Sequence, residues 1–160
     1  MSNSVTIREI QPSDLSDLLL IRNDPENYKW FTNNRKVSYI EHNLWFNQRL
    51  KMDRRLTLIA ELNNKAVGIA YLNNTLNHRI FVSINIAKDY HSLGIGSKLI
   101  NAIAMNCENL QGKYLLAKVH RENNNSKNFF EKNGFNLVEK KKLEKKFQKS
   151  NFDIYKKKLK

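Results

Sequence analysis

Tyr90-His-Ser-Leu-Gly-Ile-Gly-Ser97 is the stretch that decides the fold of this chain. It lies between a predicted strand at 79–87, rich in β-branched residues, and a predicted helix at 97–109. Two glycines one residue apart remove side chains where the backbone must approach another group closely. The free N–H groups at the start of the following helix favour an anion there, typically a phosphate. The stretch therefore predicts a strand–turn–helix unit with an anion site.

The nearest competing phosphate motifs fit this stretch poorly. A dinucleotide-binding loop would place a third glycine at Leu99, and no Gly-Lys-Ser/Thr follows as in a P-loop. On these residues alone, a glycine turn that serves only packing remains an alternative.

The rest of the chain predicts a mixed α/β fold in a single domain over residues 1–160, because strands and helices follow one another without a repeat or a linker. Ser38 and Glu41 form a capping-box pattern, and Asn63-Asn-Lys65 predicts a hairpin turn with positive φ angles. We expect the last two strands to pair at the sheet edge. The predicted strands are 5–10, 56–62, 66–72, 79–87, 114–120, 135–141 and 152–159, and the predicted helices are 12–22, 38–50, 97–109 and 123–133.

Composition narrows the class of protein. No apolar run approaches the roughly 18 residues that a membrane helix needs, so no membrane partner is expected. The segment Met1 to Ile10 lacks the features of a signal peptide, which predicts a cytoplasmic protein. Cys107 is the single cysteine, so the sequence predicts no disulfide framework and no metal, and a buried, inert thiol is favoured.

The formal net charge is +13, and residues 139–160 carry ten lysines against three acidic residues. This balance favours an anionic partner such as CoA, a nucleotide-sugar, nucleic acid or an acidic protein, or it reflects a lysine-rich coding habit. A nucleic-acid-binding role is not favoured, because only Phe147, Phe152 and Tyr155 accompany these lysines and no recognition motif is present.

A second motif follows downstream: Asn123-Asn-Asn-Ser126-Lys-Asn-Phe-Phe130-Glu-Lys-Asn-Gly134-Phe135. Together with the first stretch, it resembles the GNAT superfamily of acyl-CoA N-acyltransferases. The family loop Gln/Arg-x-x-Gly-x-Gly/Ala is matched at 91–96, except that His91 replaces Gln/Arg. The family pattern Asn-x-x-Ala/Ser-x-x-x-Tyr/Phe-x-x-x-Gly-Phe is matched at every named position of 123–135.

The resemblance implies the GNAT fold, in which helices flank a central mixed sheet of mostly antiparallel strands. It also implies an enzyme that moves the acetyl group of acetyl-CoA onto an amine. The strand end with Ile84 and Ile86 would bond the pantetheine through main-chain groups, with one N–H polarising the thioester carbonyl. Asn123 and Ser126 would contact the pantetheine or the phosphates, and Phe130 would pack against the cofactor. The alternatives are a helix cap for Asn123 and a core position for Phe130. Backbone N–H groups would bind the CoA pyrophosphate at His91, Ser92, Leu93, Gly94, Ile95, Gly96 and Ser97.

The proton transfers depart from the family pattern. Relatives often use a tyrosine at the position of Phe130 to protonate the departing thiolate, and phenylalanine cannot do so. Water, Tyr90 or His120 are the candidates, with a purely structural role as the alternative for His120. Asn85 is a candidate for preorganising the reacting groups. A protein that binds CoA without catalysing acetyl transfer remains an alternative to the enzyme.

Three segments of the N-terminal half resemble GNAT enzymes that acetylate nucleotide-linked aminodeoxy sugars of surface-glycan (pseudaminic- or legionaminic-type) biosynthesis. They are Ile21-Arg-Asn-Asp24, Trp30-Phe-Thr-Asn33 and Ser38-x-x-Glu-His42-x-x-Trp-Phe46. The pattern is shared more loosely with acetyltransferases of polyamines and of ribosomal-protein N-termini, which remain the alternatives.

The acceptor residues predicted from these segments are Arg22, Trp30, His42 and Trp45. Arg22 can make charge-assisted bonds to a diphosphate, and the aromatic rings offer faces for a sugar or a base. The alternatives are a surface carboxylate as the partner of Arg22, and a core position for Trp45 or Phe46. A homodimer is left open.

Overall fold

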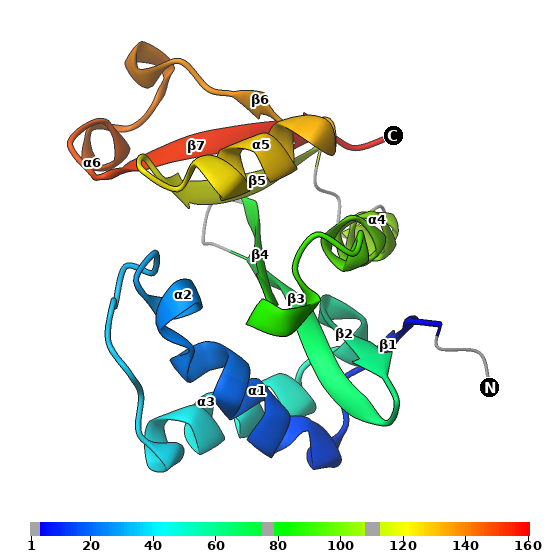
Figure 1. Cartoon of the computed structure of the whole chain (residues 1–160). Coiled ribbons are helices and arrows are strands. Elements are labelled where there is room, and N and C mark those ends of the chain that lie inside the picture. Colours follow the sequence, from blue (N-terminus) through cyan, green and yellow to red (C-terminus); the bar gives the residue numbers. More distant parts are fainter. Residues whose placement is uncertain (1–3, 75–78, 108–112) are drawn as a thin grey trace. The chain divides into compact units, whose positions relative to one another are not determined.

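The computed structural model describes residues 4–74, 79–107 and 113–160, and the chain divides into two compact units (Figure 1). Unit 1 is Met1–Tyr71 with Ile84–Asn106, and unit 2 is Leu72–Ser83 with Cys107–Lys160. Strands β3 (Lys65–Asn74) and β4 (Ile80–Ile86) contribute residues to both units. That residues 1–160 form one domain stays a prediction.

Unit 1 contains two short strands, four helices and the adjoining parts of β3 and β4. Its capping box is present as predicted: the Ser38 hydroxyl accepts from the Glu41 N–H, and the Glu41 carboxylate accepts from the Ser38 N–H. The hairpin turn is also confirmed, with φ of 51° at Asn63 and 61° at Asn64. The elements are β1 (Thr6–Glu9), α1 (Leu15–Asn23), α2 (Pro25–Tyr28), α3 (Tyr39–Lys51), β2 (Thr57–Leu62) and α4 (Ile95–Cys107).

The core of unit 1 forms where α1 and α3, which lie side by side, cover the strands (Figure 1). Leu18 and Ile21 lie three residues apart and share one face of α1, while Ile59 and Ile69 come from β2 and β3. Phe46 completes the cluster from α3 and is 2% exposed, which confirms its core position. Cys107 is fully buried as expected, and burial raises the pKa of its thiol to about 11.

In unit 2, α5 (Asn124–Lys132) packs along one face of β5 (Tyr114–His120) and β7 (Phe152–Lys158) (Figure 1). The contacts from β7 alternate as expected for a strand: Tyr155 donates to Glu131, and Lys157 donates to the Asn133 carbonyl. The remaining elements are β6 (Asn136–Leu137) and α6 (Lys145–Gln148).

The strands follow the order β1-β2-β3-β4-β5-β7-β6 in one seven-stranded sheet. β4 and β5 are parallel, whereas the pairs β1–β2, β2–β3, β5–β7 and β6–β7 are antiparallel. The predicted mixed α/β class is therefore confirmed. Within the described residues, no helix has the length and apolar character needed to cross a lipid bilayer.

Two predicted boundaries are wrong. The helix predicted from Ser97 begins at Ile95, because Gly94 with φ of 73° ends the preceding turn and its carbonyl already accepts from the Lys98 N–H. The strand predicted at 135–141 shortens to β6, since Lys140–Lys142 turn away as a 3₁₀ helix that keeps three adjacent ammonium groups in solvent. The predicted helix end at Asn109 lies outside the described residues.

Candidate functional site

The glycine turn, residues 91–97, joins β4 to α4 within unit 1. Ser92 and Gly94 have φ angles of 63° and 73°, a conformation that side chains with a Cβ rarely adopt. A Cβ at Gly94 would meet nothing within 4 Å, so the positive φ is what requires glycine here. The first N–H of α4 with a helical acceptor is that of Lys98, so the preceding N–H groups of the helix remain open to an anion.

The turn is anchored through the carbonyl oxygen of Ile86. The His91 Nε2–H donates to it at 3.0 Å, and Asn27 Nδ2 donates to it at 3.2 Å. Asn27 is 9% exposed and also donates to the Ile21 carbonyl at 3.0 Å, so it links α1 to the end of β4. Both contacts reach the same carbonyl oxygen, and the predicted pantetheine contact at Ile86 stays a prediction.

A pocket of about 260 Å³ lies within unit 1, and we call it the acceptor pocket. It gathers three of the four predicted acceptor residues, Arg22, His42 and Trp45, together with the predicted catalytic residue Asn85. Trp30 is absent from its lining, and the Lys29 ammonium lies 5.1 Å from the Trp30 ring centroid. The residues that line the pocket are Leu18, Ile21, Arg22, Val37, Glu41, His42, Trp45, Ile69, Tyr71 and Asn85.

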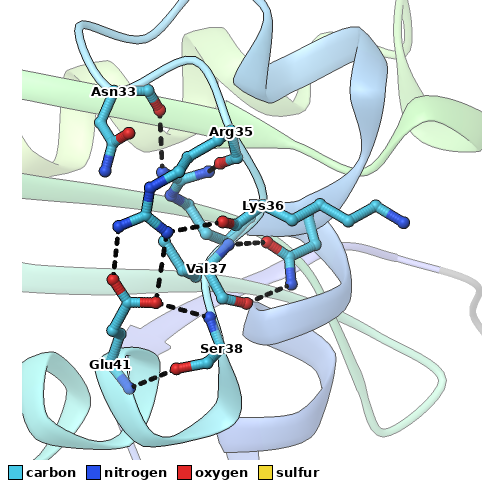
Figure 2. A network of polar contacts seen from close by, with 8 residues as sticks. Asn33, Arg35, Lys36, Val37, Ser38 and Glu41 are labelled. Atoms are coloured by element: carbon cyan, nitrogen blue, oxygen red, sulfur yellow. Dashed lines mark hydrogen bonds and ion pairs between the residues drawn. The ribbon is translucent and has the colours of Figure 1, made fainter.

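Val37 lines the acceptor pocket from the segment 31–38, which we call the wall loop and which long-range polar contacts hold in place (Figure 2). Arg22 donates to the carbonyls of Asn33 (3.2 Å) and Arg35 (3.1 Å) and lies over the Phe31 ring. The Asn23 amide exchanges two hydrogen bonds of 2.9 Å with the backbone of Val37. The alternative of a surface carboxylate as the hydrogen-bond partner of Arg22 is therefore wrong, because main-chain carbonyls take that place.

The two charged side chains that line the acceptor pocket, Glu41 and Arg22, differ in how many of their hydrogen-bonding groups are already paired. The Arg35 guanidinium and the backbone and hydroxyl of Ser38 hold the pKa of Glu41 down to about 2, so this carboxylate is ionised and already paired. Burial lowers the pKa of Arg22 from its usual value, yet arginine remains charged at neutral pH. Two of its five N–H donors are spent on the wall loop, which leaves three.

His42 is the buried polar group of this pocket, with 4% of its surface exposed. Burial lowers the pKa of the imidazole, opposed by a hydrogen bond with the Leu15 backbone, and the nearby Arg22 adds to the lowering. The ring is therefore neutral at pH 7. Its Nε2 atom has no hydrogen-bond partner, and a buried polar atom of this kind is an uncommon feature that a ligand can satisfy.

Sequence reasoning missed Tyr71 and Arg49. The Arg49 guanidinium carbon lies 4.6 Å from the Tyr71 ring centroid, and the Trp45 ring meets Tyr71 edge-on at 5.4 Å. The two aromatic rings thus form another wall of the pocket. The period-2 pattern of β3 could have indicated Tyr71, because Ile69 lies on the same face of the strand.

The other predicted residues are not among those that line this pocket. Tyr90 ends a short 3₁₀ helix and donates its N–H to Ala87. In unit 2, the Asn123 side chain accepts from the Ser126 N–H at 3.1 Å, which confirms the helix cap. Phe130 is 5% exposed and meets Phe135 at 5.0 Å, which confirms its core position.

The His120 side chain also has local partners in unit 2. Its Nδ1 accepts from the Glu122 N–H at 3.2 Å, and its ring meets Phe152 edge-on at 5.2 Å. These contacts favour the structural role over proton transfer. The cofactor and catalytic roles of the residues in unit 2 stay predictions.

The sequence matches a family described as "Acetyltransferase (GNAT) domain" over residues 4–136. The chain belongs to the GNAT family. Its predicted GNAT fold is thereby confirmed, and so is its activity: it is an N-acetyltransferase that depends on acetyl-CoA. No curated protein gives a sequence match.

Solved structures share the fold of this GNAT protein at low identity. An N-acetyltransferase from Staphylococcus aureus Mu50 is 20% identical, with a TM-score of 0.76 over 98% of this chain and 99% of that one. A ribosomal-protein-alanine N-acetyltransferase from Brucella melitensis is 22% identical, with a TM-score of 0.77 over 96% and 99%. YncA from Salmonella typhimurium, solved with its cofactor acetyl-CoA, is 17% identical, with a TM-score of 0.77 over 98% and 95%.

Proposed function

We propose that this N-acetyltransferase acetylates the amino group of a nucleotide-linked aminodeoxy sugar, and that the sugar enters the acceptor pocket. The observation that carries the proposal is the charge of the lining: Arg22 keeps free donors, whereas both oxygens of Glu41 already accept hydrogen bonds. An aliphatic polyamine needs an unpaired carboxylate, and a diphosphate needs a cation. The lining therefore favours an amine that carries an anionic group.

The size and the polarity of the pocket support a sugar ring. A volume of about 260 Å³ is below the 300 Å³ or more of a pocket for a drug-sized ligand, so the nucleotide would remain outside it. Neutral His42 would hydrogen-bond a hydroxyl, and the faces of Trp45 and Tyr71 would pack on the apolar side of the ring. Asn85 would orient the amine.

We assign the binding of acetyl-CoA to the glycine turn. Backbone N–H groups at 91–97 would bind the CoA pyrophosphate, with Gly94 supplying the positive φ. The neutral amine then attacks the thioester carbon, the C–S bond breaks, the amine loses one proton, and the CoA thiolate gains one. We assign both proton transfers to water, because Phe130 has no proton to give and His120 has local partners.

The test is a screen of acetyl transfer, read as free CoA thiol, over UDP- and dTDP-linked amino sugars, polyamines and peptides with N-terminal alanine. We expect turnover of an amino-sugar nucleotide and a rise in its KM of about tenfold in Arg22→Ala or His42→Gln, since a hydrogen bond to a charged or buried group is lost. Arg55→Ala is the matched control, because Arg55 is exposed and pairs with Asp53. Preferential turnover of polyamines or peptides would overturn the sugar assignment.

A further inference from the structure

Unit 2 contains a second and larger cavity of about 640 Å³, which we call the basic groove. It lies on the face of the strands away from α5. Tyr155 contacts Glu131 of α5, and Lys157 contacts Asn133, which caps that helix. The alternate residues Ile154 and Lys156 therefore face the opposite way, and the pairing of Leu116 with Lys156 places Leu116 beside them.

The floor and the cover of the basic groove are apolar. Phe81 and Leu116 contribute from β4 and β5, and the segment 138–147 supplies Val138, Leu143 and Phe147. The Phe81 and Phe147 ring centroids lie 6.2 Å apart, so the segment rests on the strands through this aromatic pair. A cavity of a few hundred Å³ with a mainly apolar lining and a few polar groups is typical of sites for small molecules.

The rim of the groove is positively charged. Four cationic side chains line it, Arg79, Lys113, Lys142 and Lys156, against one carboxylate, that of Glu144. Lys142 is paired with Glu139, which is outside the lining, at 3.2 Å. Glu144 is neutralised by Arg79 at 2.6 Å and by Lys146 at 3.3 Å, which hold its pKa below the usual value. The Lys156 ammonium lies 4.6 Å from the Tyr114 ring centroid, and Lys113 precedes that tyrosine in the chain.

We propose that the basic groove binds a small anionic amphipathic molecule, with an alkyl or aryl body on Phe81, Leu116 and Phe147 and a carboxylate or phosphate at Lys113 and Lys156. Apolar burial would supply most of the affinity, and the unbalanced cations would select the sign of the head group. The residues of this site are separate from those of the acceptor pocket and the glycine turn. The inference therefore does not depend on the proposed amine acceptor.

The test is calorimetric titration of the full-length enzyme, saturated with acetyl-CoA, with decanoate below its micelle threshold. Decylammonium tests the head group, acetate tests the need for the chain, and decyl phosphate separates a phosphate head from a carboxylate. We expect decanoate or decyl phosphate to bind and the two control probes to fail.

Variants locate the binding site. Lys113→Met and Lys156→Met keep the apolar stem and remove the charge, and each should weaken binding about tenfold, as loss of a hydrogen bond to a charged group does. Lys140→Met, an exposed lysine outside the groove, should bind as the wild type does. Acetyl transfer by each variant reports that the protein is folded.

The proposal is overturned by no binding of either anionic probe, by equal binding of decylammonium, or by unchanged affinity in the Lys113→Met/Lys156→Met double variant. It is also overturned if decanoate binds only to enzyme free of acetyl-CoA, which would place the probe in the cofactor site. Binding of an acidic peptide or an oligonucleotide in place of the small probes would also overturn it, since the groove would then be a macromolecular surface.

Discussion

The glycine turn at 91–97, whose last three residues begin α4, and the wall loop at 31–38 both belong to unit 1, yet they are held differently. The turn depends on backbone conformation at Ser92 and Gly94 and on contacts to one carbonyl, that of Ile86. The wall loop depends on side chains that reach across from α1. The comparison teaches that a site formed by backbone groups can be predicted from a short sequence motif, whereas a loop held by side chains from a distant helix cannot.

The largest effect is expected from removing the buried link between α1 and the end of β4, the strand that leads to the glycine turn. Asn27→Ala should lower the free energy of unfolding by about 2–3 kcal/mol, because a buried amide with two acceptors is lost and the Ile21 carbonyl loses a donor. Urea denaturation measures this. Asn47→Ala, an exposed asparagine of α3, is the control and should change stability by about 0.5 kcal/mol or less. Equal losses in both variants would show that Asn27 is no anchor.

The next effect tests whether backbone conformation is what the turn needs. Gly94→Val should strain the turn by about 1–2 kcal/mol and so weaken acetyl-CoA binding by roughly 5- to 30-fold, measured as a smaller rise in melting temperature. Gly94→Asn is the matched variant, since asparagine tolerates positive φ, and it should retain most of the shift. A valine variant that binds like the wild type would remove the turn from the cofactor site.

A smaller effect is expected where the wall loop meets α1. Asn23→Ala should lower the free energy of unfolding by about 1–2 kcal/mol, because two hydrogen bonds to Val37 are lost. It should also raise the KM for the amine while leaving the affinity for acetyl-CoA unchanged. Steady-state kinetics with each substrate varied in turn measures the split. A loss confined to acetyl-CoA affinity would mean that the loop serves the turn and not the acceptor pocket.

The smallest effect comes from one titrating group, His42. Its pKa is lowered in the folded state, so its contribution to stability is complete above the unfolded value of about 6.5 and is lost as pH falls through the lower folded pKa. Chemical denaturation from pH 7.5 to pH 5 should therefore show a decline in stability that is shallower in His42→Gln. Parallel pH profiles would indicate that the imidazole is not held neutral by burial.

Much of the fold could be predicted because its signals are local. The capping box at Ser38, the positive φ at Asn63 and the alternation of β5 each depend on residues a few positions apart. The predictions failed where a boundary depends on neighbours in space. At β6, the last N–H that donates to a carbonyl of β7 is that of Val138, and the pairing stops after it.

The residues of the candidate site likewise divide into those that the sequence predicted and those that only the structure revealed. Arg22, His42, Trp45 and Asn85 were predicted separately from motifs, and the structure brings them to one pocket. Arg49 was missed because its importance depends on its place over the Tyr71 ring, a contact between α3 and β3 that no spacing in the sequence reveals. Tyr71 was missed although the alternation of β3 places it on the same face as Ile69. Trp30 was included because it belongs to the motif, although it lies outside the pocket lining.

By itself, the sequence determined the GNAT family, the need for acetyl-CoA and the place of the glycine turn, because these depend on backbone conformation and on short-range spacing. Only the tertiary structure decided that Arg22 and Asn23 hold the wall loop, that Glu41 is already paired and that His42 is buried and neutral. Those properties depend on which distant groups surround a side chain and exclude water from it, and packing alone determines such surroundings.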